Sequence, residues 1–215
     1  MNVNIWGPSA WEILHNAAFL LDIESRESQL FFLLNDLLPC IYCLKSYREF
    51  YIQLGPPAKE MYSQWIYKIH SLVNKKLNNQ RIDKLIAKDP RLKILHQFRD
   101  DFVIEPSELV VKKRFMVNRE DPLPWRDSSV MLLSFTMAAT TPEVFTKLKL
   151  FIKELKALDP KRSQIYNELE QMPSAEALRT KLEQIKYKDL SFSKYSPRQI
   201  TELIRAHTCF EGSCY

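Results

Sequence analysis

The stretch Leu38-Pro39-Cys40-Ile41-Tyr42-Cys43-Leu44 joins two predicted helices and carries two of the chain's four cysteines. A helical pattern of apolar residues ends near Leu38, and a second pattern begins at the cysteine pair. Two cysteines separated by two residues can close a disulfide within one helical turn. At the start of a helix, unpaired backbone N–H groups favour a thiolate, which attacks disulfides and electrophilic cofactors. The stretch therefore predicts a redox-active pair on a helix.

The residues around this pair predict a compact helical bundle within the first 80 residues. Pro8 suits the first turn of a helix, and Gly55-Pro56-Pro57 is a strong stop signal. Short connections between helices favour antiparallel neighbours. The four predicted helices span residues 8–22, 27–38, 40–54 and 59–77.

The remaining residues also favour helices, so the predicted fold class is mainly all-α. We expect a first domain at 1–100 that contains the cysteine pair, an additional mainly helical region of unknown role at 101–206 and a cysteine-bearing tail at 207–215. Apolar residues alternate with other residues at 107–117, which allows a short strand or an extended arm. Residues 121–124 are typical of a linker or turn. Further helical patterns lie at 81–99, 126–139, 142–158, 160–171, 174–188 and 196–207.

Composition restricts the function. The chain is 46% hydrophobic and 27% charged, as in an ordinary soluble domain. Its 3 glycines form no glycine-rich phosphate loop. The net charge of +5 is spread out, with its densest run at Lys112-Lys113-Arg114, so we expect a solvated surface and no nucleic-acid partner. We expect no membrane span and no signal peptide. Cysteines without a secretory signal favour a redox or metal role.

Aromatic and imidazole side chains share helix faces on both sides of the cysteine pair. Trp11 and His15 lie four residues apart, as do His70 and Asn74, so each pair shares one face. Indole and imidazole rings suit a flat nucleotide. A helical bundle can therefore hold a nucleotide cofactor with side chains alone.

Three sequence blocks in this order and spacing resemble the Erv/ALR family of FAD-linked sulfhydryl oxidases, most closely the versions encoded by large DNA viruses. The first block is Trp6-Gly7-Pro8-x-x-Trp11-x-x-Leu14-His15, and the second is Cys40-x-x-Cys43. The third is Trp65, followed five residues later by His70-x-x-Val73-Asn74-x-x-Leu77. The resemblance covers residues 5–80.

The resemblance implies a four-helix bundle with a short fifth helix that binds FAD, usually as a homodimer. It implies oxidation of dithiol substrate proteins by molecular oxygen, with hydrogen peroxide as product. Cys40 would exchange with substrate thiols, and Cys43 would be the thiolate facing the flavin. Outside the resemblance, we predict Cys209 and Cys214 to be a shuttle pair, with an intersubunit or structural disulfide, or thiols without a role, as the alternatives. The cofactor-binding positions would be Trp6, Gly7, Trp11, His15, Trp65, His70, Val73, Asn74, Lys76 and Leu77.

The chain departs from the family pattern in three places. Ser71 follows His70 where an asparagine is usual, so one amide contact is replaced or lost. The structural cysteine pair beyond the fourth helix is absent, because no cysteine lies between Cys43 and Cys209. The chain continues after the bundle with residues that do not match the family's minimal form. A virus-encoded pathway would place the enzyme in the host cytoplasm or the virion.

Two other functions remain open on the residues alone. A thioredoxin-like dithiol exchange protein would need its Cys-x-x-Cys after a strand, whereas the preceding segment here is helical. A zinc-binding module would need four ligands within reach, and the two distant cysteine pairs lack the usual spacing. His96 and His207 are expected to be structural or surface residues. We expect no metal site.

Overall fold

The computed structural model describes residues 3–98 and 121–185. Every regular element within these ranges is a helix, which confirms the predicted mainly helical class. The first part contains α1 (Val3–Ile23), α2 (Leu30–Leu37), α3 (Ile41–Leu54), α4 (Tyr62–Lys88) and the 3-10 helix η1 (Pro90–Phe98). The second part contains α6 (Trp125–Ala138), α7 (Pro142–Leu158), η2 (Pro160–Arg162), α8 (Ser163–Glu170) and α9 (Ala175–Gln184).

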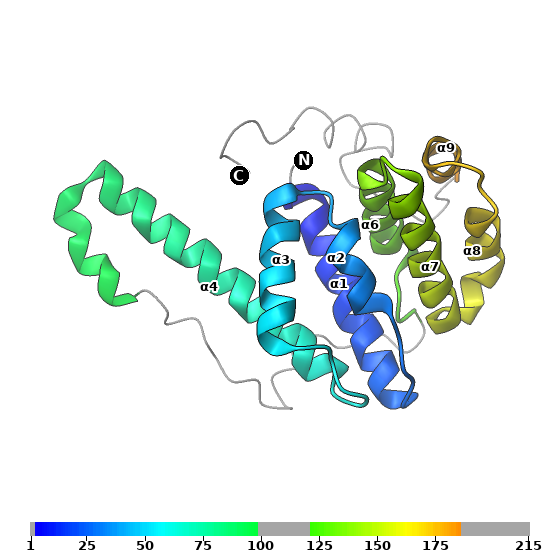
Figure 1. Cartoon of the computed structure of the whole chain (residues 1–215), viewed down its shortest axis with the longest axis horizontal. Helices are drawn as coiled ribbons and strands as arrows, with labels where there is room; N and C mark the ends of the chain where they lie inside the picture. Colours follow the sequence, from blue (N-terminus) through cyan, green and yellow to red (C-terminus); the bar gives the residue numbers. More distant parts are fainter. Residues whose placement is uncertain (1–2, 99–120, 186–215) are drawn as a thin grey trace.

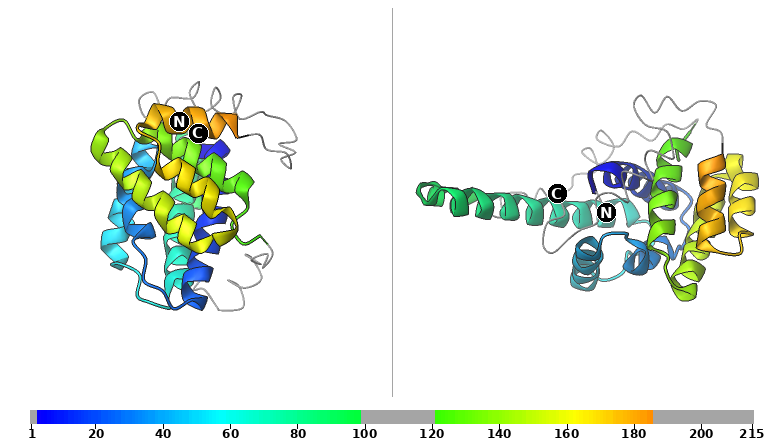
Figure 2. Two further views of the ribbon diagram at one scale, coloured as in Figure 1. Left: turned by 90° about the vertical axis from the view of Figure 1, so that its right-hand side faces the viewer. Right: turned by 90° about the horizontal axis from the view of Figure 1, so that it is seen from above.

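The helices pack in pairs that lie side by side (Figure 1). Helices α1 and α2 lie in the middle of the molecule, with α4 against α1 and α3 against α2 on one side. On the other side, α6 packs against α1 and α7 against α2. Helices α8 and α9 cover α7 and α6 at the end of the molecule far from α4 (Figure 2). One continuous hydrophobic core joins both described parts of the chain.

Polar contacts reinforce this junction between the two parts. The Ser9 hydroxyl of α1 donates to Asp127 Oδ1 of α6 at 2.6 Å. Ser28, just before α2, donates to Glu154 Oε2 of α7 at 2.7 Å. Near the end of α2, Asp36 Oδ2 lies 2.9 Å from Lys147 Nζ of α7. The predicted regions 1–100 and 101–206 therefore share one packed interior over their described residues.

The start of α1 differs from the prediction. The helix begins at Val3, so Pro8 lies inside it instead of in its first turn. Proline has no backbone N–H, and α1 consequently lacks one bond to the carbonyl group four residues earlier. Pro8 itself is exposed. The prediction of a helix starting at residue 8 was wrong because tertiary packing of Trp6 and Ala10 carries the helix across the proline.

The boundaries of α2 and α3 follow local chemistry. Helix α2 begins at Leu30, three residues later than predicted, and the Ser28 hydroxyl accepts the Leu30 N–H at 3.1 Å. Helix α3 has Cys40 as its N-cap and ends at Gly55, whose φ of 71° is left-handed. Glycine adopts this conformation without a side-chain clash, so the predicted stop is confirmed.

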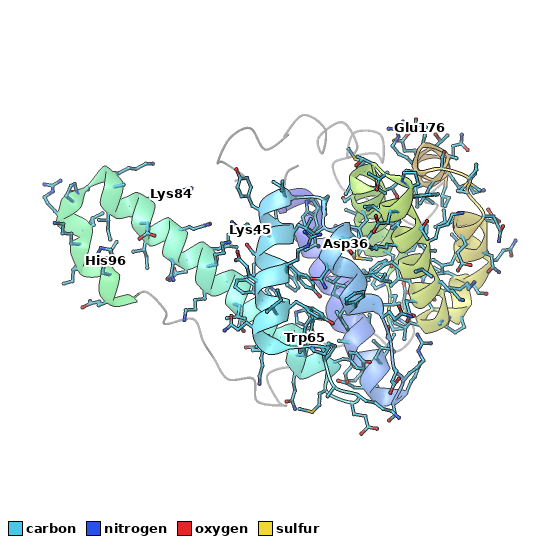
Figure 3. All side chains as sticks on the ribbon, viewed as in Figure 1. Asp36, Lys45, Trp65, Lys84, His96 and Glu176 are labelled. Carbon is cyan, nitrogen blue, oxygen red and sulfur yellow. The ribbon has the colours of Figure 1, made fainter. Side chains whose placement is uncertain are left out.

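Helix α4 runs to Lys88, well beyond the predicted end at residue 77. No glycine or proline interrupts the sequence of α4 until Pro90. The two asparagines that follow Leu77 lower the helix propensity too little to end the helix. A helix of this length spans about 40 Å. Its second half projects from the body and pairs with η1 (Figures 1 and 2). Figure 3 shows Lys84 and His96 on this projecting arm.

The predicted helices of the second part are confirmed at α6, α7, α8 and α9, with bounds that differ by at most four residues. None of the described helices has the length and apolar character required to cross a membrane. The possible strand at 107–117, the helix at 196–207 and the tail with Cys209 and Cys214 lie outside the described residues.

Candidate active site

The cysteine pair occupies the first turn of α3 and the position before it. Cys40 is the N-cap residue, with extended backbone angles, and its sulfur accepts the Cys43 N–H at 3.3 Å. The two sulfurs are present as thiols and are not joined by a disulfide. Cys40 is 1% exposed, whereas Cys43 is partly exposed. The sequence thus places both thiols where the helix N-terminus stabilises negative charge.

The two cysteines differ in the pKa of their thiols. The hydrogen bond from the Cys43 thiol, together with backbone N–H groups, lowers the pKa of Cys40 from 9.0 to about 6. The same hydrogen bond raises the pKa of Cys43, with burial and the Cys40 charge acting in the same direction. The anion of the dithiol form therefore sits on Cys40. Of the three causes that hold Cys43 protonated, the hydrogen bond and the negative charge both come from the Cys40 thiolate. Both are lost when Cys40 is covalently bound to another sulfur.

A second group of side chains lies between α1 and α4. The Trp11 and His70 rings stack with centroids 3.9 Å apart and planes 4° apart. His15 Nε2 lies 2.9 Å from His70 Nδ1, a hydrogen bond whose direction depends on the tautomers. His15 is 3% exposed. The three rings that we predicted at separate positions in the sequence are thus brought together by two facing helices.

Lys76 connects α4 to α3, the helix that begins at the cysteine pair. Its ammonium group donates to the Ser46 hydroxyl, which in turn donates to the Tyr42 carbonyl at 2.8 Å. Ser46 lies three residues after Cys43, and residues at this spacing share a helix face. Cys43 therefore lies on the side of α3 that meets α4. Along α4, His70 reaches α1 and Lys76 reaches α3, so one helix borders both groups.

Trp65 is placed apart from the three rings. It is 6% exposed and packs among Phe31, Tyr47 and Tyr51, while its Nε1 donates to the Gly55 carbonyl at 2.7 Å. Figure 3 shows Trp65 near the end of α3 and Lys45 near its beginning. The indole thus fills the bundle core at the opposite end of α3 from the cysteines.

The other predicted cofactor positions are distributed over α1 and α4. Trp6 is 4% exposed and meets Phe135 of α6 edge-on, so its ring faces the second part of the chain. Gly7 is buried, and a methyl group there would come within 3.2 Å of Val3. Val73 and Asn74 are partly exposed one turn beyond His70. Leu77 is 56% exposed at the start of the projecting arm.

Ser46 was missed by sequence reasoning. Its only signal is its position three residues after Cys43, and serine is common on helix surfaces. The contact with Lys76 depends on how α3 and α4 pack, which neither local pattern contains.

Within 3–98 and 121–185, no group of three or more His, Cys, Asp or Glu side chains could hold a metal ion. In comparisons with known proteins, the chain matches no family model, no curated protein and no solved structure.

Proposed function

We propose that the protein is an FAD-dependent thiol oxidase that makes disulfide bonds in substrate proteins. The observation that carries the proposal is a cysteine pair at the start of α3, in which the pKa of Cys40 is lowered, beside the helix that also carries His70 and Lys76. Bound FAD would accept two electrons from the dithiol and pass them to oxygen, yielding hydrogen peroxide.

The side chains between α1, α3 and α4 fit a flavin nucleotide by their chemistry. Trp11 and His70 offer aromatic faces, Asn74 offers an amide, and Lys76 offers a cation for phosphate. The Trp11–His70 stack is too close to admit another ring between its members. A flat group would therefore bind against an outer face of this stack, with His15 and Asn74 as hydrogen-bonding neighbours. Trp65 would support α3 and α4 from within the core.

The two cysteines would act in sequence. A substrate thiolate attacks Cys40 of the disulfide, which forms a mixed disulfide and releases Cys43 as the leaving thiolate. A second substrate thiol then attacks the mixed disulfide, releasing the oxidised substrate and Cys40 as a thiolate. The low pKa of Cys40 makes it a good leaving group in that second step. Cys43, on the α4 side, would be the electron donor to the cofactor.

The test uses purified full-length protein. We expect a yellow preparation with a flavin absorbance spectrum that consumes oxygen when a dithiol is added. A colourless protein that contains zinc would support the metal-site alternative instead. A colourless, metal-free protein that exchanges disulfides would support the thioredoxin-like one, although its cysteine pair follows helix α2 and not a strand.

Replacing Cys43 by serine tests the role of the pair. We expect Cys43→Ser to lose oxygen consumption by at least a factor of about 1,000, the scale for removing an essential catalytic group, while retaining the flavin spectrum. An oxygen electrode and a peroxide assay measure the loss. Retained turnover in this variant would remove the proposed electron path.

The resemblance also implies a homodimer in the cytoplasm or a virion, and we assign a shuttle role to Cys209 and Cys214. These are parts of the same proposal. Helices α6 and α7 cover one face of α1 and α2, so a second copy would have to contact other surfaces. Light scattering of the purified protein measures the oligomeric state.

A further inference from the structure

The two residues between the cysteines are exposed and apolar. Ile41 is 72% exposed and Tyr42 is 45% exposed, although both belong to the first turn of α3. That turn has no acidic residue, and the first charged side chain of α3 is the exposed Lys45. Ile41 and Tyr42 therefore form an apolar surface beside the two thiols. Because the Ile41 side chain is exposed, it has no role in the core.

Any polypeptide that exchanges with this pair must come into contact with that surface. A mixed disulfide fixes the substrate's Cα within about 7 Å of the protein's cysteine. Cys40 is 1% exposed and Cys43 is partly exposed, and the exposed Ile41 and Tyr42 lie between them in the sequence. A residue next to the substrate cysteine would therefore come close to Ile41 and Tyr42.

We propose that Ile41 and Tyr42 form the substrate-docking surface and select polypeptides with a large apolar or aromatic residue next to the reacting cysteine. The inference rests on the proposed function and names its substrate class. In the exchange, the substrate sulfur bonds to one sulfur of the Cys40–Cys43 disulfide, and the electron pair of the broken bond goes to the other sulfur. The second substrate thiol completes the transfer, so the substrate loses two electrons and two protons and the pair becomes a dithiol.

The experiment measures this exchange without oxygen. Full-length protein, with its cysteine pair oxidised by diamide, is mixed anaerobically with one of two dithiol peptides. The peptides are identical except for phenylalanine or serine after each cysteine. Alkylation and mass spectrometry then follow reduction of Cys40 and Cys43 specifically. We expect the phenylalanine peptide to react faster, by about tenfold, on the scale of burying one large apolar side chain.

The variants Ile41→Ser and Tyr42→Ser should each reduce this preference by at least threefold. Ile52→Ser is the matched control, because Ile52 is 81% exposed on the same helix and lies about 16 Å further along it. We expect it to keep the wild-type preference. Equal rates for the two peptides in the wild type, or an unchanged preference in both docking variants, would overturn the inference.

The readout separates this inference from the proposed function. Anaerobic exchange requires neither flavin nor oxygen, so a protein without oxidase activity still reports its peptide preference. Conversely, an active oxidase that shows no preference would keep the proposed function and lose the docking surface.

Discussion

At the scale of single residues, the cysteine pair shows how a local position sets chemistry. Cys40 is an N-cap residue whose sulfur accepts a backbone N–H, a role usually filled by serine, threonine or aspartate oxygens. A thiolate accepts such a bond better than a thiol does. The lowered pKa of Cys40 stabilises the dithiol form and therefore makes the Cys40–Cys43 disulfide a stronger oxidant.

The Cys40 pKa gives a direct prediction. In the dithiol form, the ultraviolet thiolate absorbance assigned to Cys40 should titrate with a pKa of about 6. Cys43→Ala removes the largest cause of the lowering, so the transition should move upward toward the ordinary value of 9.0. Subtracting the titration of a variant that lacks both Cys40 and Cys43 removes the signal of Cys209 and Cys214. An identical midpoint in wild type and Cys43→Ala would contradict the assigned cause.

The same shift predicts how stability depends on pH. Because the folded pKa of Cys40 lies below its ordinary value, ionisation stabilises the folded dithiol form fully above about pH 9. That contribution is lost as the pH falls through about 6. The disulfide form has no Cys40 thiol to ionise, so it lacks this contribution to stability.

At the scale of elements, α1 and α4 are joined by contacts at two places along their length. The imidazole and indole rings join them in their middle parts, and Asp22 at the end of α1 caps the start of α4. Its two carboxylate oxygens accept the N–H groups of Tyr62 and Ser63 at 2.8 and 2.9 Å. A carboxylate at a helix N-terminus also interacts favourably with the helix dipole. This cap sets the register that carries His70 to His15.

Removing the cap should weaken the contact between α1 and α4. We expect Asp22→Ala to lower the free energy of unfolding by about 1–2 kcal/mol, since two helix N–H groups lose their acceptor. Chemical denaturation measures the change. Glu24→Ala is the control, because Glu24 is exposed nearby and such surface changes stay within about 0.5 kcal/mol. A similar loss in both variants would show that Asp22 acts through general charge and not as a cap.

At the scale of the whole molecule, the second part of the chain completes the interior of the first. Phe135 of α6 is fully buried, with its ring 6.4 Å from Trp6 of α1 and 5.4 Å from Phe151 of α7. Without α6 and α7, the apolar faces of α1 and α2 would be open to water. The two described parts should therefore unfold together.

Phe135→Ala tests this cooperativity. We expect a loss of about 3–5 kcal/mol, the usual cost of deleting a buried aromatic ring. Hydrogen exchange should increase in α1 as well as in α6 and α7, within one unfolding transition. Phe32→Ala, at a position 55% exposed, should change stability far less. Two separate transitions, with α1 to α4 still protected, would mean that the parts are independent domains.

The sequence by itself determined the helical class, most helix positions and the location of the thiol pair at a helix start. These are local properties, because apolar periodicity and cysteine spacing act over one or two turns. Only the tertiary structure decided that Trp11, His15 and His70 meet, that Trp65 fills the core, that α4 continues to Lys88 and that Lys76 contacts Ser46. A helix pattern shows which face is apolar, but the neighbour that covers this face depends on how the whole chain packs.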